Sequence, residues 1–189
     1  SKLIEMRLLV PPGFVIRDAQ NKKYLEYIDE YYNEFISSKV AVRSSAHGED
    51  GIEASFAGQY LSILNVTNKT ELLNAIDRCV ESLEEERAKI YRRGKYDNSS
   101  EIIMNVIVQR MVKARVSGVV FSADPASGRR DLIVIDVVSG LGESLVSGSE
   151  TPDHYILNVN REVIKKEVVG DAPLLQDYEI RKLAEQAQK

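Results

Sequence analysis

The spacing of apolar residues changes along this chain, and that change limits the folds it can adopt. Apolar residues recur every three to four positions in much of residues 1–100 and every second position after residue 101. The first spacing is typical of a helix with one buried face, and the second of a half-buried strand. We therefore expect an α+β fold: a mixed first lobe over residues 1–100, then a largely antiparallel, β-rich lobe over 101–189.

Two long helices are predicted in the first lobe. One should run from about residue 19 to 37, where Asp18 is placed to cap its N-terminus. The other should begin at Thr67 or Thr70 and end near Arg93. Short strands are expected before and between these helices, at residues 14–16, 39–43 and 60–66.

The second lobe is predicted to be built from hairpins. Turn-forming residues at 124–128 and 158–161 separate stretches of alternating apolar residues. A final helix is expected from Asp177 to the last residue. The predicted strands cover residues 104–112, 116–123, 132–138, 154–159 and 163–169.

Charge and composition restrict the kinds of partner. The net charge is −4, which gives no electrostatic reason to expect nucleic acid or an anionic membrane as a partner, although a local cationic site for a small anion stays open. No apolar run approaches the ~18 residues that a membrane span needs. The single cysteine, Cys79, rules out a disulfide framework and favours a reducing setting. We expect a cytoplasmic protein.

The first candidate site lies in residues 40–59, VAVRSSAHGEDGIEASFAGQ. Arg43 and Ser44 follow an apolar strand, and an arginine offers a rigid fork of donors that matches phosphate oxygens. The small residues of 55–59, SFAGQ, allow backbone N–H groups to approach an anion closely. The segment is consistent with phosphate binding, and a strand-end salt bridge followed by a plain turn explains the same residues.

A second candidate site combines residues 106–112, VIVQRMV, with residues 117–125, SGVVFSADP. One apolar strand leading into another can form a flat, dry slot, and the amides along its edge could pair with an adenine ring. An ordinary two-stranded hairpin explains the same pattern.

A third candidate is the stretch from Asp136 to Gly148, in which a strand ends in Gly-x-Gly-Glu. Glu143 then lies at the mouth of a tight turn. Carboxylate oxygens beside a phosphate site would suit Mg²⁺, whereas a turn carboxylate can also simply be solvated. The two histidines, His47 and His154, have no metal-ligand spacing.

Taken together, these segments resemble a known family. The motifs VPPGFVI, VAVRSSAHGEDGIEASFAGQ, VIVQRMV, SGVVFSADPASG and GLGESLVSGSETPDHYIL occur in one order over nearly the whole chain. They resemble the N-terminal nucleotide-binding domain of the phosphoenolpyruvate synthase and pyruvate phosphate dikinase family. The resemblance implies an ATP-grasp fold, with ATP and Mg²⁺ as cofactors.

The resemblance also implies roles for individual residues. Arg43 matches an arginine that contacts the ATP phosphates and takes the catalytic role, with Ser44 beside it. Asp136 stands where family members often carry the longer Glu. The other implied nucleotide contacts are Gly58 and Gln59 in the phosphate loop, Gln109, Met111 and Val112 in the adenine strand, Ser122, and Glu143.

The family's activity implies the wider expectation. The parent enzyme would pass a phosphoryl group from ATP to a histidine on a swivelling domain and then to pyruvate, forming phosphoenolpyruvate. A sister enzyme with a rifamycin-type antibiotic or a glucan as acceptor is the alternative, as is a non-catalytic nucleotide-binding module. The expected partners are ATP and the phosphohistidine and acceptor-binding domains of the same polypeptide.

Two family elements have no counterpart in the printed sequence. The family carries a Gly-Gly-Lys segment before the region where Ser1 stands, and an acidic, metal-binding strand with a Gln-x-Arg element after the region of Lys189. We therefore expect a fragment of a longer enzyme, inactive on its own.

Overall fold

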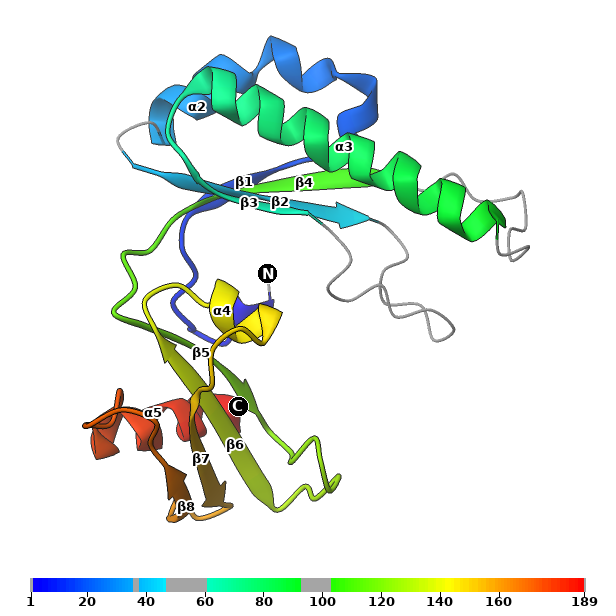
Figure 1. The fold of residues 1–189 in the computed structure, drawn as a ribbon. Helices are drawn as coiled ribbons and strands as arrows, with labels where there is room; N and C mark the ends of the chain where they lie inside the picture. The colour runs from blue at the N-terminus through cyan, green and yellow to red at the C-terminus, as the bar shows by residue number, and fades with distance from the viewer. Residues whose placement is uncertain (1, 36–37, 47–60, 93–102, 189) are drawn as a thin grey trace. The chain divides into compact units, whose positions relative to one another are not determined.

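The computed structural model describes residues 2–35, 38–46, 61–92 and 103–188 (Figure 1). The chain divides into two compact units. One unit is Pro11–Val112, and the other combines Ser1–Val10 with Lys113–Lys189. Each unit has its own four-stranded antiparallel sheet with helices, so the expected α+β class is confirmed. No helix in the described ranges is long and apolar enough to cross a membrane.

The sheet of the unit Pro11–Val112 has the strand order β1-β4-β2-β3. The long helix α3 (Lys69–Arg92) and the shorter α2 (Ile28–Phe35) lie over the same face of this sheet (Figure 1). Its core joins both helices to the two central strands through Ile28, Ile76, Val42 and Val106. The strands are β1 (Gly13–Ile16), β2 (Val40–Ala46), β3 (Ser62–Val66) and β4 (Met104–Arg110).

The long helix α3 (Lys69–Arg92) begins where the sequence predicts it. Asn68 Oδ1 accepts the amide of Glu71 at 2.9 Å, and Glu71 Oε2 accepts the amide of Thr67 at 2.7 Å. The first bond pairs an amide that the first helical turn would leave without a partner, and the second ties the residue before the cap to that turn. They also hold the pKa of Glu71 below its usual value, with the Thr67 amide as the largest cause.

The single helix predicted over 19–37 is wrong. The structure has two 3₁₀ turns, Ala19–Asn21 and Lys23–Glu26, followed by α2 (Ile28–Phe35). The break has a backbone cause, because Asp18 (φ 49°) and Lys22 (φ 58°) both adopt the left-handed conformation. A helix cannot continue through such a residue. Residues 36–37 lie outside the described part of the chain.

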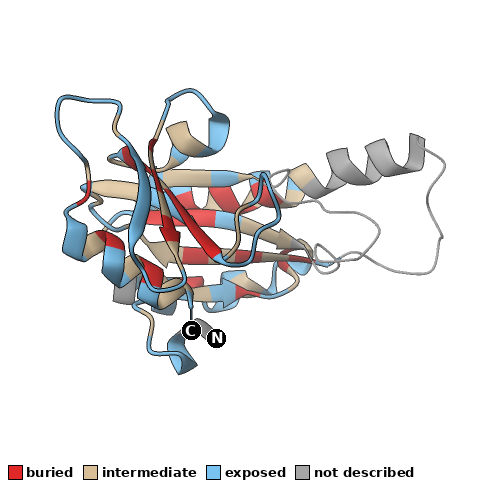
Figure 2. Ribbon diagram, turned by 90° about the horizontal axis from the view of Figure 1, so that it is seen from below, coloured by how far each residue is buried: buried red, intermediate tan, exposed pale blue. Residues whose placement is uncertain are grey.

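The sheet of the second unit has the order β5-β6-β7-β8, and α5 (Asp177–Ala187) packs against one of its faces. Ile135, Tyr155 and Ile180 are completely buried between this helix and the sheet. Figure 2 shows the buried residues as red bands along the strands. The strands are β5 (Val116–Phe121), β6 (Leu132–Ser139), β7 (Asp153–Asn158) and β8 (Val163–Glu167). The unit also contains the short helices α1 (Lys2–Glu5) and α4 (Glu143–Ser147).

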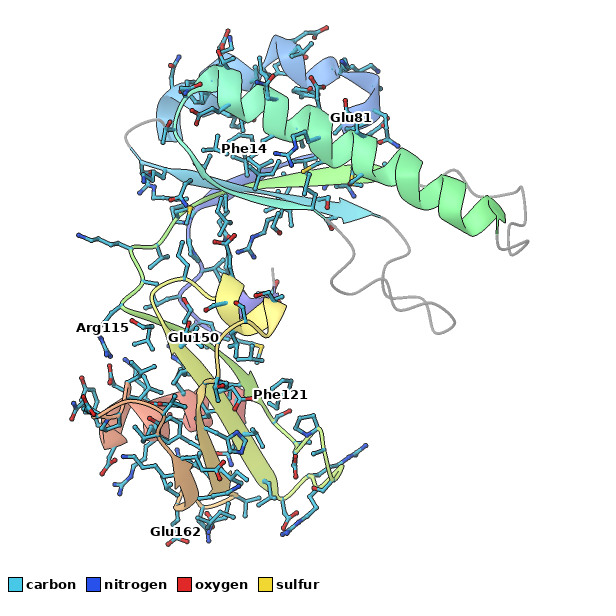
Figure 3. The ribbon with its side chains drawn as sticks, in the orientation of Figure 1. Phe14, Glu81, Arg115, Phe121, Glu150 and Glu162 are labelled. Carbon is cyan, nitrogen blue, oxygen red and sulfur yellow. The ribbon has the colours of Figure 1, made fainter. Side chains whose placement is uncertain are left out.

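Arg115, labelled in Figure 3, ties the start of β5 to the helix side of this unit. Its guanidinium donates to the carbonyl of Leu174 and to Glu179 Oε1, both at 2.7 Å. Glu179 also accepts the amide of Gln176 at 2.8 Å, which completes a capping box at the start of α5. One arginine therefore fixes both the chain before α5 and its first turn.

The division between the units differs from the expected one. We expected a boundary near residue 100, but the structure places it after Val112, because β4 is an interior strand of the first sheet. β4 pairs with β1 and β2, and β5 pairs with β6. The hairpin considered for residues 106–112 and 117–125 is therefore wrong. So is the reading of residues 104–112 as a strand of the second, hairpin-built sheet.

Candidate functional site

Arg43 lies on the face of the first sheet that the helices leave uncovered. Its neighbour Val42 is fully buried on the helix side, and successive strand residues face opposite ways. Arg43 is exposed and stands opposite Ile107 on β4 and Ser62 on β3. Among the described residues no carboxylate forms an ion pair with Arg43. The salt-bridge alternative therefore has no support in this part of the chain.

Ser44, the next residue, holds β2 to β3. Both its amide and its hydroxyl donate to the carbonyl of Leu61, each at 3.1 Å. The Ser44 hydroxyl proton is therefore engaged, and only the oxygen lone pairs remain to interact with a ligand. Gly58 and Gln59 lie outside the described residues.

The strand predicted to contact an adenine ring has few backbone N–H and C=O groups outside the sheet pairing. Gln109 stands opposite Gly13 on one side and Ala41 on the other, so its backbone belongs to the sheet. Its side-chain amide donates to the carbonyl of Pro11 at 3.0 Å. The idea of a strand with free edge amides is therefore wrong for Gln109, because β4 is a central strand.

The residues just after β4 differ from Gln109. The Met111 amide donates to the carbonyl of Lys39 at 2.8 Å, and its sulfur accepts the amide of Asn65 at 3.0 Å. Val112 follows with a side chain that is 58% exposed. Within the described residues, no hydrogen bond occupies the Val112 N–H group. Of the three residues assigned to this strand, Val112 thus has the accessible backbone donor.

Ser122 directly follows Phe121, the last residue of β5, which Figure 3 labels. Ser122 is exposed at the start of a tight turn. Asp124 organises that turn by accepting from Ser127 Oγ and from the amide of Ala126. These two bonds are the main reason why the pKa of Asp124 lies below its usual value, and the charge of His154 acts in the same direction.

Asp136 lies in the middle of β6 and is paired with a histidine. Its Oδ1 is 2.6 Å from Nδ1 of His154 on the neighbouring strand β7, and the two side chains are 23% and 28% exposed. The sequence analysis did not assign His154 to a site. Only the register of β6 against β7 shows that Asp136 and His154 are cross-strand partners.

Glu143 is exposed in the first turn of the five-residue helix α4. The glycines before it serve the turn. Gly140 has a φ of 69°, and a side chain on Gly142 would come within 3.3 Å of Ser117 Cβ. Ser117 Oγ in turn donates to the Gly140 carbonyl at 2.6 Å. The two glycines thus allow this turn to pack against β5, and the turn fixes where α4 begins with Glu143.

The predicted site residues are divided between the two units. Arg43 and Gln109 lie on one face of the first sheet, since Gln109 is opposite Ala41 and Ala41 is two residues from Arg43. The described residues contain no group of three or more acidic, histidine or cysteine side chains that could hold a metal ion. The described residues alone therefore do not fit the Mg²⁺ site that the stretch from Asp136 to Glu143 suggested.

Comparison with known proteins identifies the class of this domain. Residues 15–186 match the sequence model of an AMP/ATP-binding domain, which makes the chain a nucleotide-binding domain. The family is described as "Pyruvate phosphate dikinase, AMP/ATP-binding domain", and the chain belongs to it. The resemblance inferred from the motifs is confirmed.

Individual relatives are phosphotransferases of more than one kind. The chain is 42% identical over 131 residues to a phosphoenolpyruvate synthase of Pyrococcus furiosus. The aligned region covers 69% of the chain. It is 46% identical over 134 residues to a rifampicin phosphotransferase of a Streptomyces species, covering 70% of the chain. An uncharacterized phosphotransferase of Bacillus subtilis is 32% identical over 195 residues, covering 88% of it.

These relatives are much longer than the matched region. The matched part spans 16% of the Pyrococcus protein, 15% of the Streptomyces protein and 24% of the Bacillus protein. The relatives therefore contain further regions that this chain does not match.

Proposed function

We propose that this chain is the ATP-binding domain of a dikinase-type phosphotransferase with an ATP-grasp fold. In the proposed reaction a phosphoryl group passes from ATP to a histidine on another domain of the same polypeptide, and then to pyruvate to form phosphoenolpyruvate. The observation that carries the proposal is the match of residues 15–186 to an AMP/ATP-binding domain of this family. The 42% identity to a phosphoenolpyruvate synthase supports pyruvate as the acceptor.

The position of Arg43 supports a role at the phosphates. A triphosphate in water carries several negative charges, and phosphoryl transfer depends mainly on positioning and charge neutralisation. Arg43 is an exposed, fixed cation whose guanidinium has no ion-pair partner among the described carboxylates. Its planar fork can donate two hydrogen bonds to one phosphate, so it can both orient the group and balance its charge.

We propose that the site residues of the second unit each form one hydrogen bond with the nucleotide. The exposed Ser122 hydroxyl can donate to a phosphate oxygen, and the Asp136 carboxylate can accept from an N–H or O–H group of the nucleotide. Glu143 is assigned a nucleotide contact by the resemblance alone. Mg²⁺ belongs to the proposal only as the counterion of the ATP phosphates, and no step is derived through it.

A rifamycin-type antibiotic is the second candidate acceptor. The 46% identity to a rifampicin phosphotransferase favours it, because the same domain would serve both enzymes. In either case the acceptor would bind to other domains of the polypeptide. We propose a cytoplasmic location for the enzyme, in line with its single, buried cysteine.

The proposal is tested by calorimetric titration of the chain with ATP and Mg²⁺. We compare wild type with Arg43→Ala, and with Lys165→Ala as a matched control that removes an exposed strand cation from β8. We expect Arg43→Ala to weaken binding about tenfold or more, since it loses charge-assisted hydrogen bonds, and Lys165→Ala to bind as wild type does. A folded wild-type chain that does not bind ATP contradicts the proposal, and equal affinity of Arg43→Ala contradicts the role of Arg43.

The acceptor is tested separately, in the full-length polypeptide that contains this domain. The polypeptide is incubated with ATP and either pyruvate or rifampicin, and the products are followed by phosphorus NMR. Formation of phosphoenolpyruvate supports the first candidate, and a phosphorylated rifampicin supports the second.

A further inference from the structure

His154 and Asp136 form a hydrogen-bonded pair on the second sheet, 2.6 Å apart, and the proposed function assigns no role to His154. Ile135 and Val137, on either side of Asp136, both belong to the core under α5. Because strand residues alternate, Asp136 points to the opposite face of the sheet. His154 is its direct cross-strand neighbour on that same face.

The pairing determines which ring nitrogen of His154 carries a proton. A carboxylate only accepts hydrogen bonds, so at a separation of 2.6 Å the Nδ1 atom of His154 donates to Asp136 Oδ1. Within the described residues, no side chain other than His154 hydrogen-bonds to Asp136, which leaves Oδ2 available to a ligand.

Buried apolar side chains next to Asp136 strengthen its hydrogen bond to His154. Val134 and Val138 flank Asp136 on the same face and are only 2% and 1% exposed. Apolar neighbours that exclude water strengthen a hydrogen bond to a charged group. An aspartate is also shorter than a glutamate, so its carboxylate can be placed only close to its own strand. A fixed rotamer therefore matters more for Asp136 than for a longer side chain.

We propose that His154 is a positioning residue for nucleotide binding: its Nδ1–H group holds the Asp136 carboxylate in one orientation, so that Oδ2 accepts a hydrogen bond from an N–H or O–H group of the nucleotide. The inference rests on the proposed function, because it assumes that ATP meets Asp136. It adds a residue to the site that neither the motifs nor the family description assigns.

The charged groups around His154 are mostly acidic. Asp136 faces it from β6, Glu167 is its cross-strand partner on β8, and Asp124 in the turn after β5 interacts with its charge. Arg129, which pairs with Asp131, belongs to the same turn as Asp124. Among these groups only Asp136 hydrogen-bonds to the ring within the described residues, so Asp136 is the partner of His154.

Three substitutions separate the donor from the bulk of the ring. His154→Asn keeps an N–H group at the position of Nδ1, His154→Gln places one near the position of Nε2, and His154→Leu has no donor. We expect the Asn variant to bind ATP within about twofold of wild type. The Leu and Gln variants should bind about three- to tenfold more weakly, which is the cost of immobilising one side chain only on binding.

A double variant distinguishes positioning from a structural role. In the double variant of His154→Leu with Asp136→Asn, binding should be no weaker than with Asp136→Asn alone. Circular dichroism confirms that each variant is folded, and the Gln variant replaces the Leu variant if the latter unfolds.

Different results would contradict the role of His154 and the proposed ATP binding on which it rests. If the wild-type chain does not bind ATP, both are overturned. If the wild-type chain binds ATP and the Leu and Gln variants bind equally well, only the role of His154 is overturned. The same holds if nitrogen NMR of His154 in the free chain shows Nδ1 without a proton.

Discussion

The Met111 amide donates to the carbonyl of Lys39 at 2.8 Å, so the pairing of β4 with the β2 side continues one residue beyond both strands. On the opposite side of β4, the Arg110 amide donates to the carbonyl of Pro12 at 2.9 Å. The backbone donors of β4 are thus used up to Met111. Val112 is the next residue, and its N–H group has no hydrogen bond within the described part of the chain.

Val112→Pro should therefore weaken ATP binding. Proline removes the N–H group and restricts Met111 to an extended conformation, while the exposed valine side chain contributes little packing. We expect an affinity about three- to tenfold lower than that of wild type, which corresponds to one lost hydrogen bond. Calorimetric titration with ATP measures the change.

Val112→Ala is the control for this prediction. It shortens the same side chain and keeps the N–H group, so its affinity should equal that of wild type. If the proline variant is folded and binds ATP normally, the Val112 backbone does not meet the nucleotide.

Much of the secondary structure could be predicted from local pattern. The start of α3 follows from Asn68 and Glu71, whose side chains cap it through bonds within five residues. The strand β6 follows from its run of β-branched residues over Leu132–Ser139, and β7 from the β-forming residues Tyr155, Ile156 and Leu157. In each case the determining residues are close together in the sequence.

The partner of β4 could not be predicted in this way. Its neighbours β1 and β2 are far away in sequence; the bond from Gln109 to Pro11 closes a separation of 98 residues. Alternation of buried valines shows that Val106 and Val108 belong to a strand, but it does not select the sheet. The break in the predicted helix near Lys22 likewise depends on a left-handed backbone that the apolar spacing does not reveal.

The candidate site shows the same division. Arg43 and Asp136 were found because they lie in recognisable motifs, and the structure adds the strand register of Arg43 and the side-chain contact of Asp136. The contact between Asp136 and His154 depends on the register of β6 against β7, which places those two residues opposite each other. The residue pattern of each strand does not by itself give its register against the neighbouring strand, so this contact required the structure.

Gly118 should be essential to the second sheet. A Cβ atom at this position would lie 2.4 Å from the carbonyl oxygen of Asp136 and 2.6 Å from Val137 Cγ1. Because the nearest atom is backbone, the strand itself would have to move. Gly118→Ala should lower the free energy of unfolding by about 1–3 kcal/mol.

Hydrogen exchange at the Ile135 amide in β6 measures this loss locally, which avoids assuming that both units unfold together. Gly170→Ala is the matched control, since the nearest atom to its Cβ would be 3.9 Å away. Equal exchange rates in the two variants would contradict the steric argument.

Cys79 should be unreactive in the folded chain. Burial in the core under α3 raises the pKa of its thiol to about 11, although the neighbouring Arg78 acts in the opposite direction. The thiolate is the nucleophile, so almost none is present at pH 8, and the sulfur is completely buried. A thiol reagent such as dithionitrobenzoate should modify the native chain very slowly and release one equivalent once the chain is unfolded in urea.

The same reaction reports on the stability of the unit Pro11–Val112, because Cys79 is the only cysteine in the sequence. Ile76→Val, which removes one methyl group beside it in the same core, should speed the modification by destabilising the unit about 0.5–1.5 kcal/mol. Rapid, stoichiometric modification of the native wild-type chain at pH 8 would contradict this prediction.

Tyr155 should make the second unit sensitive to alkali. Burial raises the pKa of its phenol to about 12, and the hydrogen bond to Asp153 acts in the same direction. A group whose pKa is higher in the folded than in the unfolded state, where it is about 10, contributes stability that is complete below pH 10. That stability is lost as the pH rises towards 12, with a slope of up to about 1.4 kcal/mol per pH unit.

Tyr155→Phe isolates this contribution, because phenylalanine keeps the ring in the core and cannot ionise. The variant should be less stable than wild type at pH 8, since Asp153 loses one of its three hydrogen-bond donors and keeps the amides of Val169 and Leu174. Its stability should then fall less steeply between pH 10 and 12. Urea unfolding at several pH values between 10 and 12, followed by circular dichroism, gives the free energy of unfolding of each protein. The slopes of these values against pH are then compared. Parallel slopes would show that the folded chain does not hold the phenol of Tyr155 in its neutral form.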